Sequence, residues 1–458
     1  MYRPRFFTSI LGALAVSLSA NANSRDVIVI ENVNVIPMTS EVVNKNQSVV
    51  VKNGKVEAIC PVGTKACVVE GAAILPAGGK YLIPGLSDMH AHVNLGETDM
   101  IGSEQGKQAA AKRAQDQMLQ QYLDFGVTTI RDPAGGPSNL KLRDDINSGR
   151  RMAPRLFTSW KVMDTAPKLH PATTAFNSPE EAAEFVRQTA ANDYDMVKVY
   201  SNLSPEAFAA ITSTAKKLNI RVAGHVPIQV DFEDALKAGV RSFEHLTGFD
   251  IACAQGEFEM TPTMLHVYQG WAFCTPDKIE RLAKLTAKYE VWIDPTLIVM
   301  DELNTDYQRH TEFDEGAIKY APASRPAVME YLYEIFPAHS RAALQGTKST
   351  RLGIVKALSD AGVPLLIGTD TLSSGYNVHQ ELALFVEAGL TPYQALRAGT
   401  VEPARYFQKE GEFGTIVKGA SADFVLLDAN PLDDIANALK ISGVMVRGHW
   451  LGTEKSSR

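Results

Sequence analysis

The chain has 458 residues, more than one ordinary hydrophobic core holds, which predicts one large domain with a smaller one. Its hydrophobic fraction of 45% and charged fraction of 21% are typical of a globular protein, and its formal net charge is −7. This acidic balance, without a long Lys/Arg run, argues against a nucleic-acid partner, because such a partner binds a clustered basic surface.

The first 22 residues have the layout of a signal peptide. Arg3 and Arg5 precede an apolar stretch over residues 6–18, and the small residues Ala20 and Ala22 follow at alternate positions. A membrane anchor is the alternative, but about 20 apolar residues are needed to span a bilayer and this stretch is shorter. We predict cleavage after Ala22, a periplasmic or secreted mature protein, and no membrane association after cleavage.

Strand patterns occur at both ends of the mature chain. Residues 27–59 hold β-branched runs around Asn53-Gly54, which is a strong hairpin signal. Residues 422–446 return to the same pattern after a different middle. We therefore predict one small β-sandwich domain built from both chain ends. Its expected boundaries are residues 23–80 and 408–458.

The middle of the chain alternates between amphipathic helices and short apolar strands. Several strands follow a glycine that would end a helix, as in Phe125-Gly126-Val127. Eight strands alternating with helices indicate the α/β class and a (β/α)₈ TIM-type barrel, here over residues 81–407. The predicted strands are Leu86–His92, Val127–Arg131, Arg155–Ser159, Met196–Tyr200, Ile220–Gly224, Arg241–Glu244, Val291–Asp294 and Pro364–Gly368.

One long insertion, at about residues 297–362, interrupts this alternation between the seventh and eighth strands. A long insertion at the top of a barrel often covers the active site. A structural outer helix or a dimer contact is the alternative. The sequence leaves the oligomeric state open, and a homo-oligomer is compatible with it.

Four cysteines are available for disulfides: Cys60, Cys67, Cys253 and Cys274. Export to an oxidising compartment permits pairing, and of the three pairings the two local ones need no long-range contact. Four free thiols are the alternative. The segment between Cys253 and Cys274 holds glycine, proline and few periodic apolar residues, so it predicts an excursion above the barrel. We expect a Cys253–Cys274 bridge there.

Two histidines close the first predicted barrel strand. In this fold the site lies at the carboxyl ends of the strands, so polar residues there are candidates. His90 and His92 are two positions apart, and alternate side chains of a strand share a face, so both imidazoles are expected to point into the barrel. One such pair is a weak signal, because two ordinary surface histidines are the commoner explanation.

Four other predicted strands also carry or precede a metal-capable residue. Lys198 lies in an apolar strand that should not hold a charge without a reason. Taken one at a time, the other residues have ordinary explanations, such as a hydrogen-bonded histidine in the core or an aspartate that caps a helix. Jointly, these explanations require six coincidences at one end of one barrel. Imidazoles and carboxylates suit Zn²⁺. A lysine cation does not, but an amine that reacts with carbon dioxide becomes an anionic carbamate able to bridge two metals. The full set is His90, His92, Lys198, His225, His245 and Asp370.

Five segments carry recognisable motifs: LIPGLSDMHAH at 82–92, GHVP at 224–227, EH at 244–245, GTDT at 368–371 and GTIVKGASAD at 414–423. They resemble those of the amidohydrolase superfamily, in the branch of imidazolonepropionase-like proteins and metal-dependent Xaa-Pro or Xaa-Arg/Lys dipeptidases. The resemblance covers nearly the whole mature chain and is weakest at about 251–345.

The resemblance implies two divalent metal ions, with zinc expected. His90, His92 and Asp370 would bind the first, His225 and His245 the second, and carboxylated Lys198 and a hydroxide would bridge them. Two metals lower the pKa of the bridging water and polarise the substrate carbonyl. Asp370 would take the proton as the hydroxide attacks and deliver it to the leaving amine. Similar deaminases use one metal without a bridging lysine, and Lys198 favours two.

Three further residues are candidate substrate contacts. Tyr200 shares the inward face of Lys198 and lies nearer the rim, with core packing as the alternative. Arg131 ends the second strand and could hold a substrate carboxylate, although a salt bridge behind the site is the simpler expectation. His379 opens a predicted helix after Asp370.

The predicted function is hydrolysis of an amide bond, with small peptides or N-acyl amino acids as the leading substrates and Asp370 as general base and acid. One alternative is a lactam, lactone or other cyclic C–N substrate on the same site. Another is a periplasmic metal- or ligand-binding protein without turnover. The expected partner is a small-molecule or peptide substrate.

Overall fold

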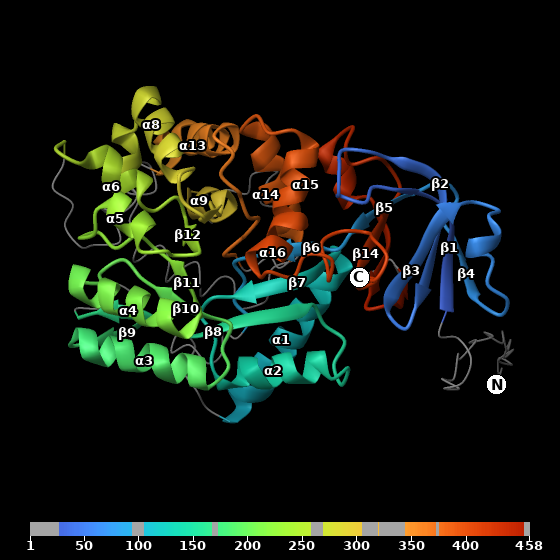
Figure 1. Cartoon of the computed structure of the whole chain (residues 1–458), viewed down its shortest axis with the longest axis horizontal. Coiled ribbons are helices and arrows are strands. Elements are labelled where there is room, and N and C mark those ends of the chain that lie inside the picture. Colours follow the sequence, from blue (N-terminus) through green and yellow to red (C-terminus); the bar gives the residue numbers. More distant parts are fainter. Residues whose placement is uncertain are drawn as a thin grey trace, which may run out of the picture.

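The computed structural model describes residues 27–93, 105–166, 173–257, 269–304, 319, 344–371 and 375–452. The predicted signal peptide and its cleavage site lie outside these residues. None of the helices that the structure describes is long and apolar enough to span a bilayer. Figure 1 shows a β-rich part, made of the first and last strands, beside a larger body of mixed strands and helices.

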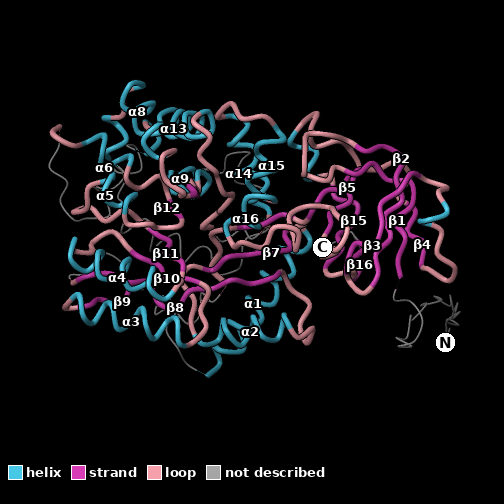
Figure 2. The backbone as a smooth tube through the Cα atoms, viewed as in Figure 1, coloured by secondary structure: helices cyan, strands magenta, loops and turns pink. Residues whose placement is uncertain are grey.

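Strands from both chain ends form one sheet, which Figure 2 shows gathered at one end of the molecule. Its order is β16-β15-β14-β5-β1-β2-β3, with β4 also paired to β1. The strands are β1 (Val27–Val35), β2 (Asn44–Lys52), β3 (Lys55–Pro61), β4 (Ala73–Pro76), β5 (Tyr81–Pro84), β14 (Phe424–Leu427), β15 (Ile441–Val446) and β16 (His449–Gly452). The prediction of one small β domain built from both ends is confirmed.

The boundary of this sheet differs from the expected one. Tyr81–Pro84, expected in the barrel, pairs antiparallel with Phe424–Leu427 in the small sheet. The predicted hairpin is present, because β2 and β3 meet at Asn53-Gly54, where both residues have positive φ. Thus the N-terminal strands reach the C-terminal ones through β5, the last strand before the barrel begins.

The larger sheet is parallel and curls into the barrel wall, in the order β13-β12-β11-β10-β8-β7-β6. Seven of the eight predicted strands are present. A short strand, β9, was not predicted and pairs parallel to the end of β8. The strands are β6 (Leu86–Asp88), β7 (Val127–Asp132), β8 (Arg155–Thr165), β9 (Thr173–Phe176), β10 (Met196–Val199), β11 (Arg221–Gly224), β12 (Ser242–Glu244) and β13 (Trp292–Asp294).

The eighth predicted strand, residues 364–368, forms only a single bridge, between Leu365 and Ile293. Pro364 has no amide hydrogen, which limits a regular ladder. The segment nevertheless bonds on both sides and so closes the ring of strands, in agreement with the predicted barrel. The backbone bonds are Ile293 N to Pro364 O (3.0 Å), Leu366 N to Ile293 O (2.9 Å), Met89 N to Ile367 O (2.8 Å) and Asp370 N to His90 O (2.8 Å).

Helices surround the barrel (Figure 1). Four of them begin with Ser or Thr followed by proline, and in each the hydroxyl accepts a bond from an amide of the first turn. The helices are α1 (Gln105–Asp124), α2 (Pro137–Asn147), α3 (Pro179–Ala191), α4 (Pro205–Leu218), α5 (Phe232–Lys237), α6 (Phe249–Ala254), α8 (Pro276–Thr286), α9 (Leu297–Asn304), α13 (Lys348–Asp360), α14 (Tyr376–Glu387), α15 (Pro392–Gly399) and α16 (Val401–Tyr406), with 3₁₀ turns η1 (Lys65–Cys67), η2 (Gln269–Phe273) and η3 (Ile435–Leu439). The middle of the predicted insertion, 305–318 and 320–343, lies outside the described residues, so its expected covering role stays a prediction.

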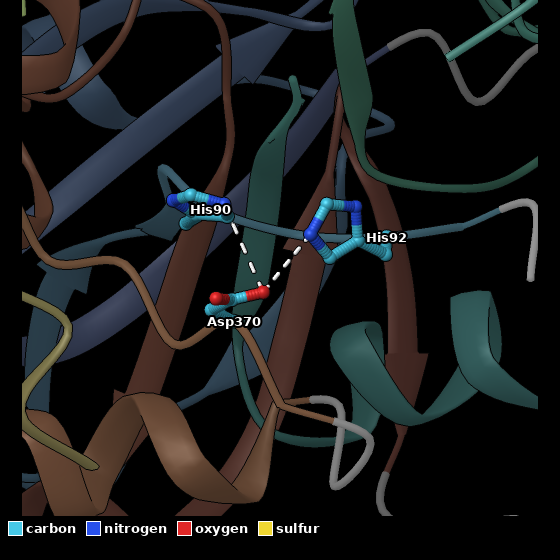
Figure 3. A group of neighbouring side chains, drawn as sticks. All are labelled: His90, His92 and Asp370. Atoms are coloured by element: carbon cyan, nitrogen blue, oxygen red, sulfur yellow. Dashed lines mark ion pairs between the residues drawn. The ribbon is translucent and has the colours of Figure 1, made fainter. Parts of the chain in front are cut away.

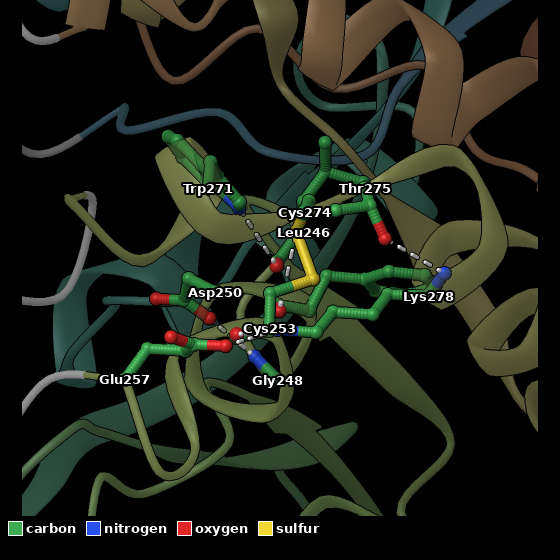
Figure 4. Close-up of a disulfide and its surroundings, with 10 residues drawn as sticks. Leu246, Gly248, Asp250, Cys253, Glu257, Trp271, Cys274, Thr275 and Lys278 are labelled. Atoms are coloured by element: carbon green, nitrogen blue, oxygen red, sulfur yellow. Dashed lines mark hydrogen bonds and ion pairs between the residues drawn. A yellow bond between two sulfur atoms is a disulfide. The ribbon is translucent and has the colours of Figure 1, made fainter.

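Both local disulfides are formed. The predicted Cys253–Cys274 bridge is confirmed and joins α6 to the residue after η2, with an Sγ–Sγ distance of 2.09 Å (Figure 4). Cys60 is paired with Cys67 in the small sheet. Nearby, Lys278 Nζ donates to the Cys253 carbonyl at 2.9 Å. The bridge therefore fastens the chain that leaves β12, although residues 258–268 of this excursion lie outside the described part.

Replacing Cys253 and Cys274 by serine is expected to lower the free energy of unfolding by about 3 kcal/mol, because the open loop gains entropy in the unfolded chain. Equilibrium guanidinium unfolding of protein purified under oxidising conditions measures this. The matched control is the Cys60→Ser/Cys67→Ser variant, whose bridge spans 7 rather than 21 positions and should cost less. A larger loss in the control would contradict the loop argument.

Candidate metal centre

The six predicted residues gather at the end of the barrel where the parallel strands finish, called here the carboxyl rim. Two follow β6, one lies in β10, one follows each of β11 and β12, and the last follows the 364–368 segment. Parallel strands all end on the same side, so residues far apart in sequence meet there. His90, Lys198, His225 and His245 are only 2–4% exposed, and His92 and Asp370 are partly exposed.

Asp370 brings three of the histidines together. Its Oδ1 lies 2.9 Å from His92 Nε2 and 3.8 Å from His90 Nε2. Figure 3 marks these two ion pairs as dashed lines. Its Oδ2 lies 3.7 Å from His245 Nε2. His90, His92 and Asp370 each offer one ligand atom, and these atoms lie within 4.8 Å of one another, close enough for one metal ion. These are the three residues that the family resemblance assigns to the first metal ion.

His225 and Lys198 lie beside this group. The His225 ring centroid is 4.9 Å from that of His245, and Lys198 Nζ is 4.0 Å from Glu244 Oε2. Within the described part of the chain, neither His225 Nε2 nor Lys198 Nζ has a hydrogen-bond partner, although both are buried. Leaving such polar atoms unsatisfied is costly. Buried, unpartnered nitrogen atoms beside a His–Asp cluster fit a bound cation.

Burial lowers the pKa of three imidazoles. It brings the pKa of His90 to about 4 and that of His245 to about 3, and it holds the pKa of His225 well below its ordinary value. These rings are therefore neutral at pH 7, the form that binds metal. Burial also lowers the pKa of Lys198, which favours the neutral amine that can attack carbon dioxide.

His92 and Asp370 shift each other's pKa. Burial opposes charging of His92, but its bonds to Asp132 and Asp370 outweigh this and raise its pKa to about 10. Burial would raise the pKa of Asp370, yet His90, His92 and His245 hold it well below its usual range. Asp370 is therefore anionic at working pH, and a metal ion at His92 would displace its proton.

A side chain lies behind each buried histidine at Nδ1, which directs Nε2 into the site. A partner that accepts from Nδ1 leaves Nε2 free to bind a metal. A carboxylate can only accept, whereas a hydroxyl can accept or donate. The pairs are His90 Nδ1 with Glu244 Oε2 (2.9 Å), His225 Nδ1 with Ser201 Oγ (2.7 Å) and His245 Nδ1 with Thr296 Oγ1 (2.6 Å).

Three carboxylates at this rim were not predicted as site residues: Asp88, Glu244 and Asp294. Asp88 accepts bonds from the amides of His90 (3.1 Å) and Thr369 (3.0 Å), which ties the first strand to the last. All three are fully buried at the ends of apolar strands. A charged residue in that position was the signal that could have identified them.

The structure places Arg131 in an ion-pair network. Its Nη2 donates to Glu244 Oε2 at 2.8 Å and to Asp294 Oδ2 at 3.0 Å, and its Nη1 donates to Ser242 Oγ at 2.8 Å. The side chain is fully buried. These contacts occupy the guanidinium behind the site, so the geometry favours the salt-bridge interpretation of Arg131 over a contact with a substrate carboxylate.

Arg131→Met is expected to lower the free energy of unfolding by about 3–5 kcal/mol, because it leaves Glu244 as an uncompensated buried carboxylate. Urea unfolding of metal-free protein measures this without any substrate. Unchanged stability combined with a raised KM would instead assign Arg131 to substrate binding.

Tyr200 and His379 occupy different surroundings. The Tyr200 ring lies 4.3 Å from that of His225 and is partly exposed, so its substrate contact stays a prediction. His379 is buried in α14, and its Nε2 donates to the Phe125 carbonyl at 2.9 Å. That bond fastens α14 to the end of α1. It gives His379 a packing role, and the predicted substrate contact gains no support from it.

Comparison with known proteins finds one family model and several relatives. The model of the amidohydrolase family matches residues 81–451. Ochratoxinase of Aspergillus niger is 24% identical over 403 residues, covering 77% of this chain and 71% of the relative. Adenine deaminase 2 of Bradyrhizobium sp. (strain ORS 278) is 24% identical over 412 residues, covering 88% of this chain and 54% of the relative.

Solved structures share the fold. A Xaa-Pro dipeptidase with methionine bound in its active site superposes with a TM-score of 0.69 at 21% identity, covering 93% of this chain and 100% of that one. Bottromycin amidohydrolase superposes with a TM-score of 0.71 at 24% identity, covering 93% and 87%. These likenesses support the barrel with its attached β domain.

Proposed function

The chain belongs to the amidohydrolase family and is a hydrolase of carbon–nitrogen bonds, and from this premise we propose that it cleaves an amide bond in small peptides or N-acyl amino acids. The observation that carries the proposal is the convergence of three histidines on Asp370 at the carboxyl rim. A dipeptidase and a bottromycin amidohydrolase among the structural neighbours support an amide substrate.

Two divalent cations, with zinc expected, complete this proposed site. Four imidazoles and a carboxylate form a donor set that suits zinc. His90, His92 and Asp370 would hold one cation, His225 and His245 the other, and Lys198, carboxylated by carbon dioxide, would lie between them. When bound, such cations polarise a substrate carbonyl and lower the pKa of a water molecule. The unpartnered His225 Nε2 and Lys198 Nζ support this assignment.

Asp370 moves the proton in the proposed reaction. Its side chain is 25% exposed, so it faces both the buried histidines and the solvent side of the rim. It accepts a proton from the attacking water as the C–O bond forms, and donates that proton to the nitrogen as the C–N bond breaks. The products are a carboxylic acid and an amine. Tyr200, beside His225, is the proposed substrate contact.

One alternative substrate class is a cyclic one on the same site. An adenine deaminase among the relatives supports hydrolysis of a C–N bond in a ring system, and a lactam or a lactone belongs to the same class.

A substrate screen tests the proposal. Zinc-loaded protein is assayed against a dipeptide library, N-acyl amino acids, lactams and lactones, with Asp370→Asn as the control for contaminating activity. We expect amine release from dipeptides or N-acyl amino acids by the wild-type protein alone. Turnover of cyclic substrates only would favour the alternative chemistry, and no turnover of peptides or N-acyl amino acids by fully metallated protein would contradict the proposal.

The proposed location is the periplasm or the cell exterior, with the mature chain starting after Ala22. The two disulfides support this, because such bonds persist in oxidising compartments. N-terminal sequencing of protein recovered from the native host checks the cleavage position.

A further inference from the structure

The buried histidines differ in the chemistry that holds them. His225 and His245 have a neutral hydroxyl at Nδ1, from Ser201 and Thr296. His90 has the Glu244 carboxylate there, at 2.9 Å. A bond to a carboxylate is stronger than one to a hydroxyl and raises the basicity of the imidazole as a ligand. Among these three buried histidines, the charge-assisted contact at Nδ1 is therefore on His90.

Both carboxylate oxygens of Glu244 accept hydrogen bonds from the protein. Its Oε1 accepts from Ser242 Oγ at 2.8 Å, and its Oε2 accepts from Arg131 Nη2 at 2.8 Å as well as from His90. The carboxylate is fully buried, so water does not compete for these oxygens. Both oxygens have protein donors, and the group cannot rotate without breaking bonds.

The guanidinium that holds Glu244 is anchored in turn. Arg131 Nε donates to the Met89 carbonyl, one residue before His90, and Nη2 also donates to Asp294. The Arg131 guanidinium carbon lies 5.1 Å from the Tyr406 ring centroid. One network thus fixes both the backbone beside His90 and the carboxylate behind its ring.

We propose that Glu244 is a positioning residue for the metal centre, which holds His90 in the Nδ1–H tautomer with Nε2 aimed at Asp370 and thereby strengthens metal binding there. The inference deepens the proposed function and rests on it for the identity of the ligand. In this role Glu244, the residue before His245, orients a metal ligand and does not itself bind the metal. Arg131 supports this role because its guanidinium donates to the Glu244 carboxylate and so holds it in place.

The test compares Glu244→Gln with Asp294→Asn. Both change a buried carboxylate on the same guanidinium into an amide, but only Glu244 touches His90. Zinc is removed with a chelator, and zinc affinity is measured by competition with a chromophoric chelator. Thermal melts of the metal-free proteins check the fold. We expect Glu244→Gln to weaken zinc binding by roughly 10–100-fold and Asp294→Asn by much less.

A second measurement does not depend on a Glu244 variant that folds. ¹⁵N-histidine spectra of the metal-free wild-type protein report which ring nitrogen carries the proton, with His90 assigned by comparison with His90→Asn. We expect Nδ1–H for His90. A neutral His90 protonated at Nε2, or equal losses of zinc affinity in the two carboxylate variants, would overturn the positioning role.

The outcomes separate this inference from the proposed function. Unchanged zinc affinity in Glu244→Gln removes the role of Glu244 and leaves amide hydrolysis intact. Wild-type protein that binds zinc tightly but hydrolyses no amide removes the proposed function, while a selective loss in Glu244→Gln still supports the positioning role.

Discussion

Asp370→Asn is expected to reduce kcat by roughly 10²–10⁴-fold while the protein keeps at least one bound zinc ion. The amide has nearly the shape of the carboxylate but cannot accept a proton as the carboxylate does. His90 and His92 remain as ligands of the first site, and His225 and His245 as ligands of the second. The loss should therefore fall on kcat much more than on zinc content.

Steady-state kinetics on the substrate found by the screen, together with metal analysis of the same samples, measure this. The matched control is Asp193→Asn, which changes a side chain that is 95% exposed and lies before β10, at the opposite end of the barrel. It should behave as wild type. Near wild-type kcat in Asp370→Asn would remove this residue from the chemistry.

Lys198→Arg is expected to lower the zinc content from about two ions per chain to about one and to reduce kcat by on the order of 10²-fold or more. Arginine stays cationic at every working pH and does not form a carbamate. Its charge would also lie close to the imidazoles of His90 and His225. The second cation would lose its bridging ligand and meet a positive charge instead.

Carbon dioxide provides an independent test on the unaltered protein. Metal-free wild-type protein reconstituted with zinc and bicarbonate should bind two ions, and fewer when carbon dioxide is excluded. Lys141→Arg, in an exposed lysine of α2, is the matched control and should show the wild-type response. One ion per chain, with a free Lys198 amine in a high-resolution map, would favour a deaminase-like site.

The barrel could be predicted because its strands are short apolar runs that follow helix-ending glycines. The eighth segment was harder, because Pro364 prevents a regular ladder and its role depends on bonds to Ile293 and Met89. β9 has no apolar run to mark it, because two of its four residues, Thr173 and Thr174, are polar. β5 was assigned to the barrel because its apolar run continues almost directly into β6, and its pairing with β14 and β1 places it in the small sheet instead.

The ligand candidates could be predicted because each falls at a strand end, where the fold itself decides which residues meet. The supporting groups could not. Glu244 lies 154 positions from His90 and 113 from Arg131, so its contacts follow from the curvature of the sheet rather than from any local spacing. Arg131 could be placed at the rim from its strand, but whether it faced substrate or the interior depended on those distant carboxylates.

The small sheet has a consequence for biosynthesis. β5 is made early, yet its partner β14 begins at Phe424, after the whole barrel. Lys80 Nζ and Ser442 Oγ, 362 positions apart, are in contact at 2.7 Å in the finished protein. Until the last strands are available, one edge of β5 stays open, and open edges favour wrong pairing. A chain truncated before residue 424 should therefore be prone to aggregation and a target for chaperones and proteases.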